Sequence, residues 1–168
     1  MSFVIIGYYF KRQLIFKNRF EDLIEEKVSG NKKELGVNGK QAGLSSKIID
    51  PIMSNLDAFE LKKQFLSQKV SLHDLATSFS INPRYLSKVI NLQKDKSFPR
   101  YINDLRVDYA LKELTENQKF RKFTIKAIAS DCGFKSSESF SRAFYKRHGI
   151  FPSYYIKKIE ALKSQISS

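Results

Sequence analysis

Cysteine and histidine are scarce in this sequence, which has one cysteine and two histidines among 168 residues. A single cysteine excludes an intrachain disulfide framework and is typical of a protein from a reducing cytosol. The soft ligands are also too few for a structural zinc site. A Gly-rich phosphate loop, carboxylates paired at catalytic spacing and a nucleophile–base arrangement are all missing. We therefore expect a protein that is not an enzyme and has no metal, no cofactor and no small-molecule site.

Long apolar runs are missing as well, since no segment approaches the roughly 20 residues that a transmembrane helix needs. Charge of one sign, in contrast, is abundant. The chain has 30 Lys and Arg against 17 Asp and Glu, a net charge of +13. The excess is concentrated in residues 84–112 and 119–163, while residues 51–83 are neutral. Such a distribution indicates a polyanionic partner, which is a nucleic acid or, less often, an anionic membrane surface.

The first 49 residues differ in composition from the rest. They begin with an apolar and aromatic run at 3–10, and their final part, 29–47, holds four of the seven glycines and reads as a linker. From residue 50 onward helical periodicity dominates and strand signals are weak. We predict an N-terminal segment over 1–49 and an all-α domain over 50–165.

The first helix of this domain is predicted at residues 51–67. Asp50 is a suitable N-cap, and Pro51 suits the first helical position. Apolar residues then follow at helical spacing: Ile52, Leu56, Phe59 and Leu66.

An internal repeat is the most informative feature of the sequence. The first copy, SLHDLATSFSINPRYLSKVI, covers residues 71–90, and the second, TIKAIASDCGFKSSESFSRAF, covers residues 124–144. Ser71 and Thr124 are matching N-caps, and two apolar anchors and an alanine follow each at the same spacing. A short helix, a sharp turn and a second helix fit both copies, so the repeat predicts two helix-turn-helix motifs, at about 71–92 and 124–148.

The turns differ in one residue. Gly133 can take a positive φ without penalty, and Ser80 occupies the same place in the first copy. The next apolar residue, Ile81 or Phe134, is expected to fill the space between the two helices. Inward-facing positions of the second helices are predicted to be Leu86, Val89 and Ile90 in the first motif and Phe140, Ala143 and Phe144 in the second.

The opposite faces carry basic and polar groups that suit base edges and phosphates: Arg and Lys can donate to guanine, Asn can pair with adenine, and Glu can accept from cytosine. A solvated outer face is the alternative, but two copies inside basic blocks favour DNA contact. The predicted DNA-binding residues of the first motif are Asn82, Arg84, Tyr85, Ser87, Lys88 and Asn91. Those of the second motif are Lys135, Ser136, Ser137, Glu138, Ser139, Ser141, Arg142, Lys146 and Arg147.

A third helix should connect the motifs, at about residues 98–115. Its apolar residues surround much of the helix, which predicts burial against both motifs. Its apolar stretch from Phe98 to Leu114 has seventeen residues, which make a rod of about 25 Å. A monomer with such a connector could place two recognition helices in successive major grooves, roughly 34 Å apart on B-DNA.

The remaining cysteine and histidines have structural interpretations. Cys132 lies in the second turn and is expected to be a small buried apolar residue rather than a redox sensor. His73 is expected to be exposed, and His148 to lie in the last turn of a helix, where the macrodipole favours it.

The stretch from Ala129 to Tyr155 resembles the C-terminal signature of the AraC/XylS family, A-x3-G-F-x-S…F-S-R-x-F-[KRY]-[KR]…G-x-x-P-x-x-[YF]. The segments YLSKVIN and FPRYINDLRV also match, so the resemblance covers about residues 50–160. It implies a seven-helix module of two subdomains, with double-stranded DNA and RNA polymerase as partners. Phe151 departs from the usual Ser or Thr, and Ile156 replaces a frequent Arg, which could remove a phosphate contact beside Lys157 and Lys158.

The amino-acid sequence of the domain is similar to those of one subgroup of the family. In this subgroup the module forms the cytoplasmic end of membrane-anchored regulators with upstream helical-repeat sensor regions. Two interpretations then fit residues 3–12. They are the end of a transmembrane helix, with Lys11 and Arg12 on the cytoplasmic side, or an apolar patch on the domain. The expected location is the cytoplasm, with or without this tether. A membrane-associated adaptor that binds lipid or protein through basic helices is the alternative function.

Overall fold

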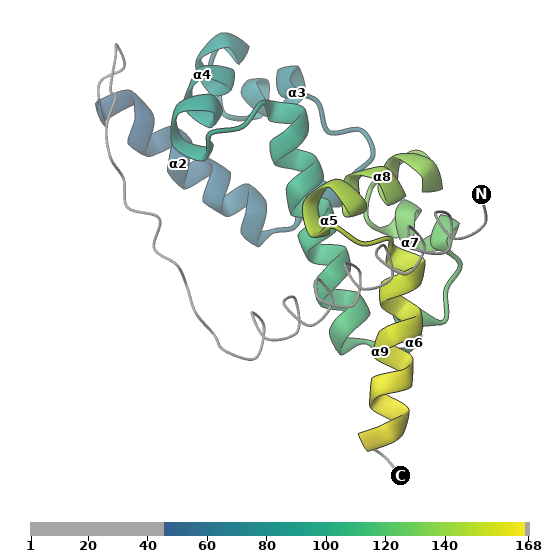
Figure 1. Cartoon of the computed structure of the whole chain (residues 1–168). Helices are drawn as coiled ribbons and strands as arrows, with labels where there is room; N and C mark the ends of the chain where they lie inside the picture. Colours follow the sequence, from purple (N-terminus) through teal and green to yellow (C-terminus); the bar gives the residue numbers. More distant parts are fainter. Residues whose placement is uncertain (1–45, 167–168) are drawn as a thin grey trace, which may run out of the picture. The chain divides into compact units, whose positions relative to one another are not determined.

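The structure is a computed structural model that describes residues 46–166, with side chains from 48 to 165. The interpretations of residues 3–12 and of most of the linker lie outside the described residues. No strand occurs within the described range, and the all-α prediction is confirmed. The helices in Figure 1 are α2 (Ser46–Leu61), α3 (Leu72–Ser78), α4 (Pro83–Lys94), α5 (Phe98–Glu116), α6 (Gln118–Arg121), α7 (Ile125–Asp131), α8 (Ser137–His148) and α9 (Pro152–Ile166), with a 3-10 helix η1 (Gln64–Leu66).

The described residues fall into two compact units. One comprises residues 46–140, from α2 to the first turn of α8, and the other comprises residues 141–166, the rest of α8 and α9.

Helix α2 contradicts the predicted start at Asp50 and Pro51. It begins at Ser46, and Pro51 lies inside it. A proline removes one backbone donor and crowds the preceding turn, which is least harmful near a helix N-terminus. Three residues of the predicted apolar face, Ile52, Leu56 and Phe59, are buried as expected and at most 2% exposed. Helix packing on these residues therefore outweighs the local signal of the proline.

The predicted end of this helix at residue 67 is also wrong. Helix α2 ends at Leu61, and Lys63 adopts a left-handed conformation with φ +52 before η1. Phe65 is the buried residue of this segment, and Leu66 is only partly buried. The side chains of Phe59 and Phe65 meet edge to face, with ring centroids 6.4 Å apart. The break thus turns a second aromatic ring into the same core, which an uninterrupted helix would not do.

The first helix-turn-helix motif forms as the repeat predicts. The Oγ atom of Ser71 accepts a hydrogen bond from Asp74 N and caps α3. Ser80 takes a positive φ of 56°, and Ile81 packs against the core. Asn82 caps α4, and Pro83 is its first residue. These interactions are local, which is why the sequence identifies them.

The second motif repeats this arrangement. Thr124 Oγ1 accepts from Ala127 N at the start of α7, and Gly133 has φ +83. Phe134 is 5% exposed and meets Phe140 edge to face at 5.4 Å. The predicted N-cap, the positive φ in the turn and the burial of Phe134 are therefore confirmed for the second motif.

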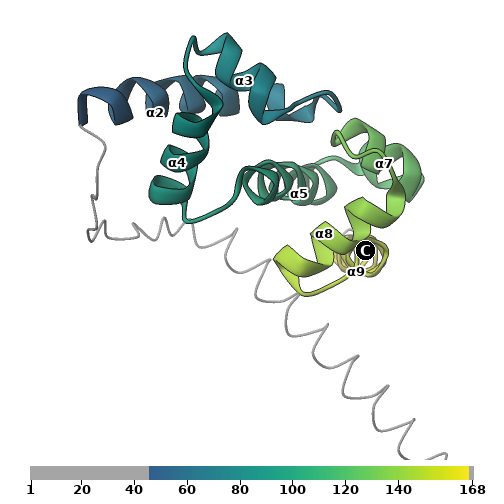
Figure 2. The same cartoon turned by 90° about the horizontal axis from the view of Figure 1, so that it is seen from above.

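Helix α5 is the connector. Figures 1 and 2 both show it with α4 on one side and α7 on the other, and it contacts η1, α4 and α6. It has 19 residues, two more than the predicted apolar stretch. Its buried residues include Tyr101, Ile102, Val107, Ala110, Leu111 and Leu114, together with Arg106.

In the unit 141–166, the core holds Phe144, Ile150, Tyr155 and Ile159, each at most 2% exposed. Helix α8 ends where Gly149, with φ +76, donates its N–H to the carbonyl of Tyr145. The unusual Phe151 stacks on Tyr145, with centroids 4.6 Å apart. No helix in the described part of the chain has the length and apolarity needed to cross a membrane.

Candidate nucleic-acid interface

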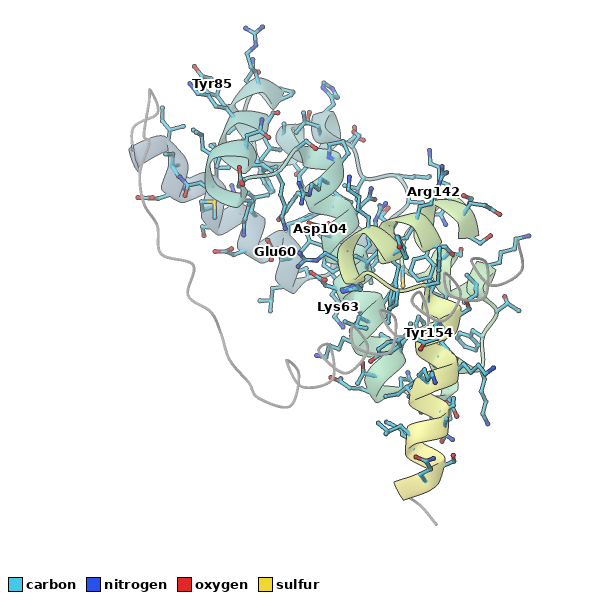
Figure 3. All side chains as sticks on the ribbon, in the orientation of Figure 1. Glu60, Lys63, Tyr85, Asp104, Arg142 and Tyr154 are labelled. Atoms are coloured by element: carbon cyan, nitrogen blue, oxygen red, sulfur yellow. The ribbon has the colours of Figure 1, made fainter. Side chains whose placement is uncertain are left out.

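Helix α4 has one apolar and one polar face. Leu86, Val89 and Ile90 have no exposed surface, as predicted. Most of the predicted contact residues on the other side are exposed, and Tyr85 retains 49% of its surface (Figure 3). The exposed set is Asn82, Arg84, Tyr85, Lys88 and Asn91, while Ser87 is half-buried. Arginine, lysine and asparagine on one exposed face can donate to phosphates and base edges.

Asn82 has a structural role as well. Its Oδ1 atom accepts a hydrogen bond from Arg84 N at 2.8 Å, which satisfies one of the unpaired donors at the start of α4. The cap holds the first turn, and therefore Arg84, in a helical conformation.

The start of α8 is similarly organised by serines. Ser136 Oγ accepts from Ser139 N at 3.2 Å, and Ser139 Oγ donates to the carbonyl of Ser136. Ser137 Oγ donates to Glu138 Oε1 at 3.1 Å. Lys135, Ser136 and Glu138 are exposed, whereas Ser137 and Ser139 are half-buried. Two of the predicted contact residues, Ser136 and Ser139, therefore stabilise the helix start.

Farther along α8, Phe144 is fully buried and Ala143 is half-buried, so the predicted inward face is largely confirmed. Phe144 contacts His148 edge to face at 4.8 Å and Tyr155 at 6.3 Å. Arg142, labelled in Figure 3, is exposed, as are Lys146 and Arg147, and Ser141 is half-buried.

Exposed cations on these faces include Lys88 on α4 and Arg142 and Lys146 on α8. Two ion pairs among the described residues join Lys94 to Glu60 at 3.1 Å and Lys96 to Asp104 at 2.8 Å. Neither involves a predicted contact residue. Exposed cations of this kind are the groups that neutralise phosphates and release counterions on nucleic acid.

Glu60 supports the first motif from α2, a role that the sequence did not indicate. Glu60 Oε1 accepts from Tyr101 Oη at 2.7 Å and from Lys94 Nζ at 3.1 Å. It therefore ties α2 to α4 and α5. Burial, with the hydrogen bond to Glu60 next in importance, raises the pKa of Tyr101 above its ordinary value.

Arg106 is the second residue missed. It is 8% exposed, and it donates Nε to the carbonyl of Phe65 and a terminal nitrogen to the carbonyl of Ser67, both at 2.7 Å. Burial lowers the pKa of the guanidinium from its ordinary value. A charged residue within the apolar face of the predicted connector was the available signal, because buried arginine occurs only where its donors are satisfied.

The cysteine and histidines lie largely as expected. Cys132 has no exposed surface, and burial raises the pKa of its thiol to about 12, so the thiolate is not formed near neutral pH. His73 is exposed, and His148 lies in the last turn of α8 but is 8% exposed. No cluster of three or more metal-ligating side chains occurs among the described residues.

Comparison with known proteins gives a family. A model described as a helix-turn-helix domain matches residues 75–158, half of the chain. The HTH-type transcriptional regulator Rv1931c of Mycobacterium tuberculosis is 32% identical over 84 residues, which are 50% of this chain and 31% of that protein. The chain thus spans about a third of this relative's length.

Two solved structures share the fold. The DNA-binding domain of AdpA, in complex with a target DNA, superposes with a TM-score of 0.59 at 16% identity over 68% of this chain and 97% of that one. An AraC-type transcriptional regulator from Chromobacterium violaceum gives a TM-score of 0.55 at 18% identity, over 68% and 96%. With the tandem motifs and the matched residues, these findings show that the chain belongs to the AraC-type family of helix-turn-helix domains.

Proposed function

We propose that this chain is the DNA-reading part of a transcriptional regulator and binds duplex DNA sequence-specifically. The observation that carries the proposal is the pair of helix-turn-helix motifs with matching caps and turns, in each of which the second helix has a basic and polar outer face. The family and the regulator relatives support the same function.

In this proposal α4 and α8 each enter a major groove. Arg84, Lys88 and Asn91 read bases or phosphates from α4, with Tyr85 and Ser87 at the edges of the contact. Glu138, Arg142 and Lys146 do so from α8. The first turn contributes Asn82, and the second contributes Lys135, Ser136, Ser137 and Ser139, with Ser141 and Arg147 farther along the helix. Arginine or lysine donates to guanine, asparagine pairs with adenine and glutamate accepts from cytosine.

The length of the connector helix α5 supports the binding of DNA by both motifs of a single chain. A 19-residue helix is about 28 Å long, close to one turn of B-DNA. A single chain could therefore bind an asymmetric site of roughly two turns without a dimer. We propose the domain limits that the sequence predicts, which are residues 50–165 for the domain and about 71–92 and 124–148 for the two motifs.

The wider setting is also a proposal. The chain acts in the cytoplasm without catalysing a reaction, positions RNA polymerase, and receives its signal from a separate sensor region. The larger size of Rv1931c, of which this chain spans 31%, is compatible with such a division of labour.

Selection of bound duplexes from a random pool tests the proposal, with the full chain and a stated salt concentration. We expect one asymmetric motif to be enriched, and affinity to fall steeply as salt rises. Vesicles with and without anionic lipid form the second arm. Binding to anionic vesicles without enrichment of any sequence would replace the proposed function by the lipid-binding alternative.

A further inference from the structure

Arg106 has an unusual set of partners for a buried charge. Its two hydrogen bonds of 2.7 Å reach the carbonyls of Phe65 and Ser67, which lie 41 and 39 residues earlier in the chain. Within the described residues it forms no ion pair. Hydrogen bonds from an ionised donor are shorter and stronger than neutral ones. The guanidinium therefore fastens the connector helix to the segment that links α2 with the first motif.

The same side chain touches the turn of the second motif. The guanidinium carbon lies 5.6 Å from the ring centroid of Phe134. A Cβ atom built on Gly133 would be 2.9 Å from Arg106 Nε and 2.5 Å from the carbonyl oxygen of Leu66. Only a residue without a side chain allows this approach. Phe134 in turn packs edge to face on Phe140 in the first turn of α8.

A second bridge crosses the same joint. Gln68 donates Nε2 to the carbonyl of Phe134 at 3.2 Å and to Ser130 Oγ at 3.3 Å. Gln68 belongs to the segment before α3, whereas Ser130 and Phe134 belong to α7 and the turn after it. Two side chains from different elements thus hold the same turn.

We propose that Arg106 is a positioning residue that sets the half-site spacing this chain accepts on DNA, because it fixes the turn of the second motif relative to the first. The inference rests on the proposed function. One base pair of added spacer moves a half-site by about 3.4 Å and rotates it by about 34°. A rigid joint cannot follow that movement, whereas a loosened joint can.

Arg106→Lys keeps the positive charge but removes the planar guanidinium that donates to two carbonyls at once. The ammonium group of lysine is a compact donor on a flexible side chain and cannot reproduce this geometry. Arg121→Lys is the matched control. Arg121 is 6% exposed and donates to the carbonyls of Leu114 and Thr115 at the end of the connector itself. Both replacements disturb a buried arginine, but these two hydrogen bonds of Arg121 reach the end of the connector and not the segment before α3.

The probes are the duplex that the wild-type chain selects from a random pool and two versions with one base pair inserted or deleted between the half-sites. We expect the wild type and Arg121→Lys to lose about tenfold in affinity on each altered spacing. Arg106→Lys should lose less than about threefold. A role in stability alone would weaken binding to all three duplexes and leave their ratio unchanged.

If Arg106→Lys does not fold, Gln68→Ala tests the same joint, since Gln68 is exposed and its loss is milder. It should also reduce the ratio of the affinity for the selected spacing to the affinity for an altered spacing. If either variant folds and keeps the wild-type value of this ratio, the inference is overturned while the proposed function stands. Failure of the wild type to enrich any sequence would overturn both.

Discussion

The turns of the two helix-turn-helix motifs have the same backbone and different surroundings. In each, the apolar residue after the turn donates its N–H to an alanine carbonyl. These bonds run from Ile81 to Ala76 at 3.0 Å and from Phe134 to Ala129 at 2.8 Å. The preceding residue has φ +56 at Ser80 and +83 at Gly133. Ser80 is exposed, whereas Gly133 is buried against a carbonyl and a guanidinium.

The difference shows that turn geometry and turn composition have separate causes. The backbone requires a positive φ in both motifs, and either serine or glycine can supply it at some cost. The demand for glycine arises only in the second, where Leu66 and Arg106 leave no room for a Cβ atom. Four experiments compare the two motifs directly.

Gly133→Ala should have the largest effect. It places a Cβ atom 2.5 Å from backbone and forces alanine into a left-handed conformation, so we expect a loss of about 3 kcal/mol or more in unfolding free energy. Urea denaturation measures it. The matched variant Ser80→Ala should cost less than about 1 kcal/mol, because a side chain is already tolerated there. Similar losses in the two variants would mean that the turns are equivalent.

Removing one exposed cation from each recognition helix compares the motifs as readers of DNA. Lys88→Ala in α4 and Arg142→Ala in α8 should each lower discrimination between the selected duplex and a scrambled one by about 1–3 kcal/mol. Titration binding at fixed salt measures both affinities. Lys112→Ala, an exposed lysine of the connector, is the control.

The pattern of loss is informative. Equal weakening on both duplexes would identify a phosphate contact, and an effect in only one helix would show that a single motif reads sequence. Lower stability with unchanged discrimination would reject the recognition role of that residue.

The N-caps offer a smaller test of the repeat. Ser71→Ala and Thr124→Ala should each cost about 1 kcal/mol in unfolding free energy, because each removes the acceptor for a first-turn N–H. Ser71 should cost somewhat more, since its Oγ atom also donates to Asp74 Oδ2 at 2.6 Å. Replacement by Asn at either site keeps a capping oxygen and should recover most of the loss. No recovery would assign the loss to something other than capping.

Ser80→Gly should have the smallest effect and the opposite sign. Glycine relieves the left-handed strain at φ +56 but adds freedom to the unfolded chain, so the net gain should be below about 1 kcal/mol. Thermal denaturation can detect it. A measurable loss would show that the Ser80 side chain makes a contribution that its exposure does not suggest.

The sequence predicted most local features correctly. The caps at Ser71 and Thr124, the positive φ at Gly133 and the buried face of α4 were all predicted, because each depends on residues three or four positions apart. It failed at α2. Asp50 and Pro51 carry the local signal of a helix start, and the helix passes through them because Ile52, Leu56 and Phe59 are buried in the core.

Three properties of this protein follow from its sequence: it is helical, it contains two copies of one motif, and the second helix of each copy has one apolar face. Periodicity and capping are properties of neighbouring residues, so they can be read without coordinates. The contacts that hold the second turn, and that leave its glycine without a substitute, became apparent from the three-dimensional arrangement. The partners of Arg106 lie about 40 residues away, and no local pattern specifies a contact at that separation.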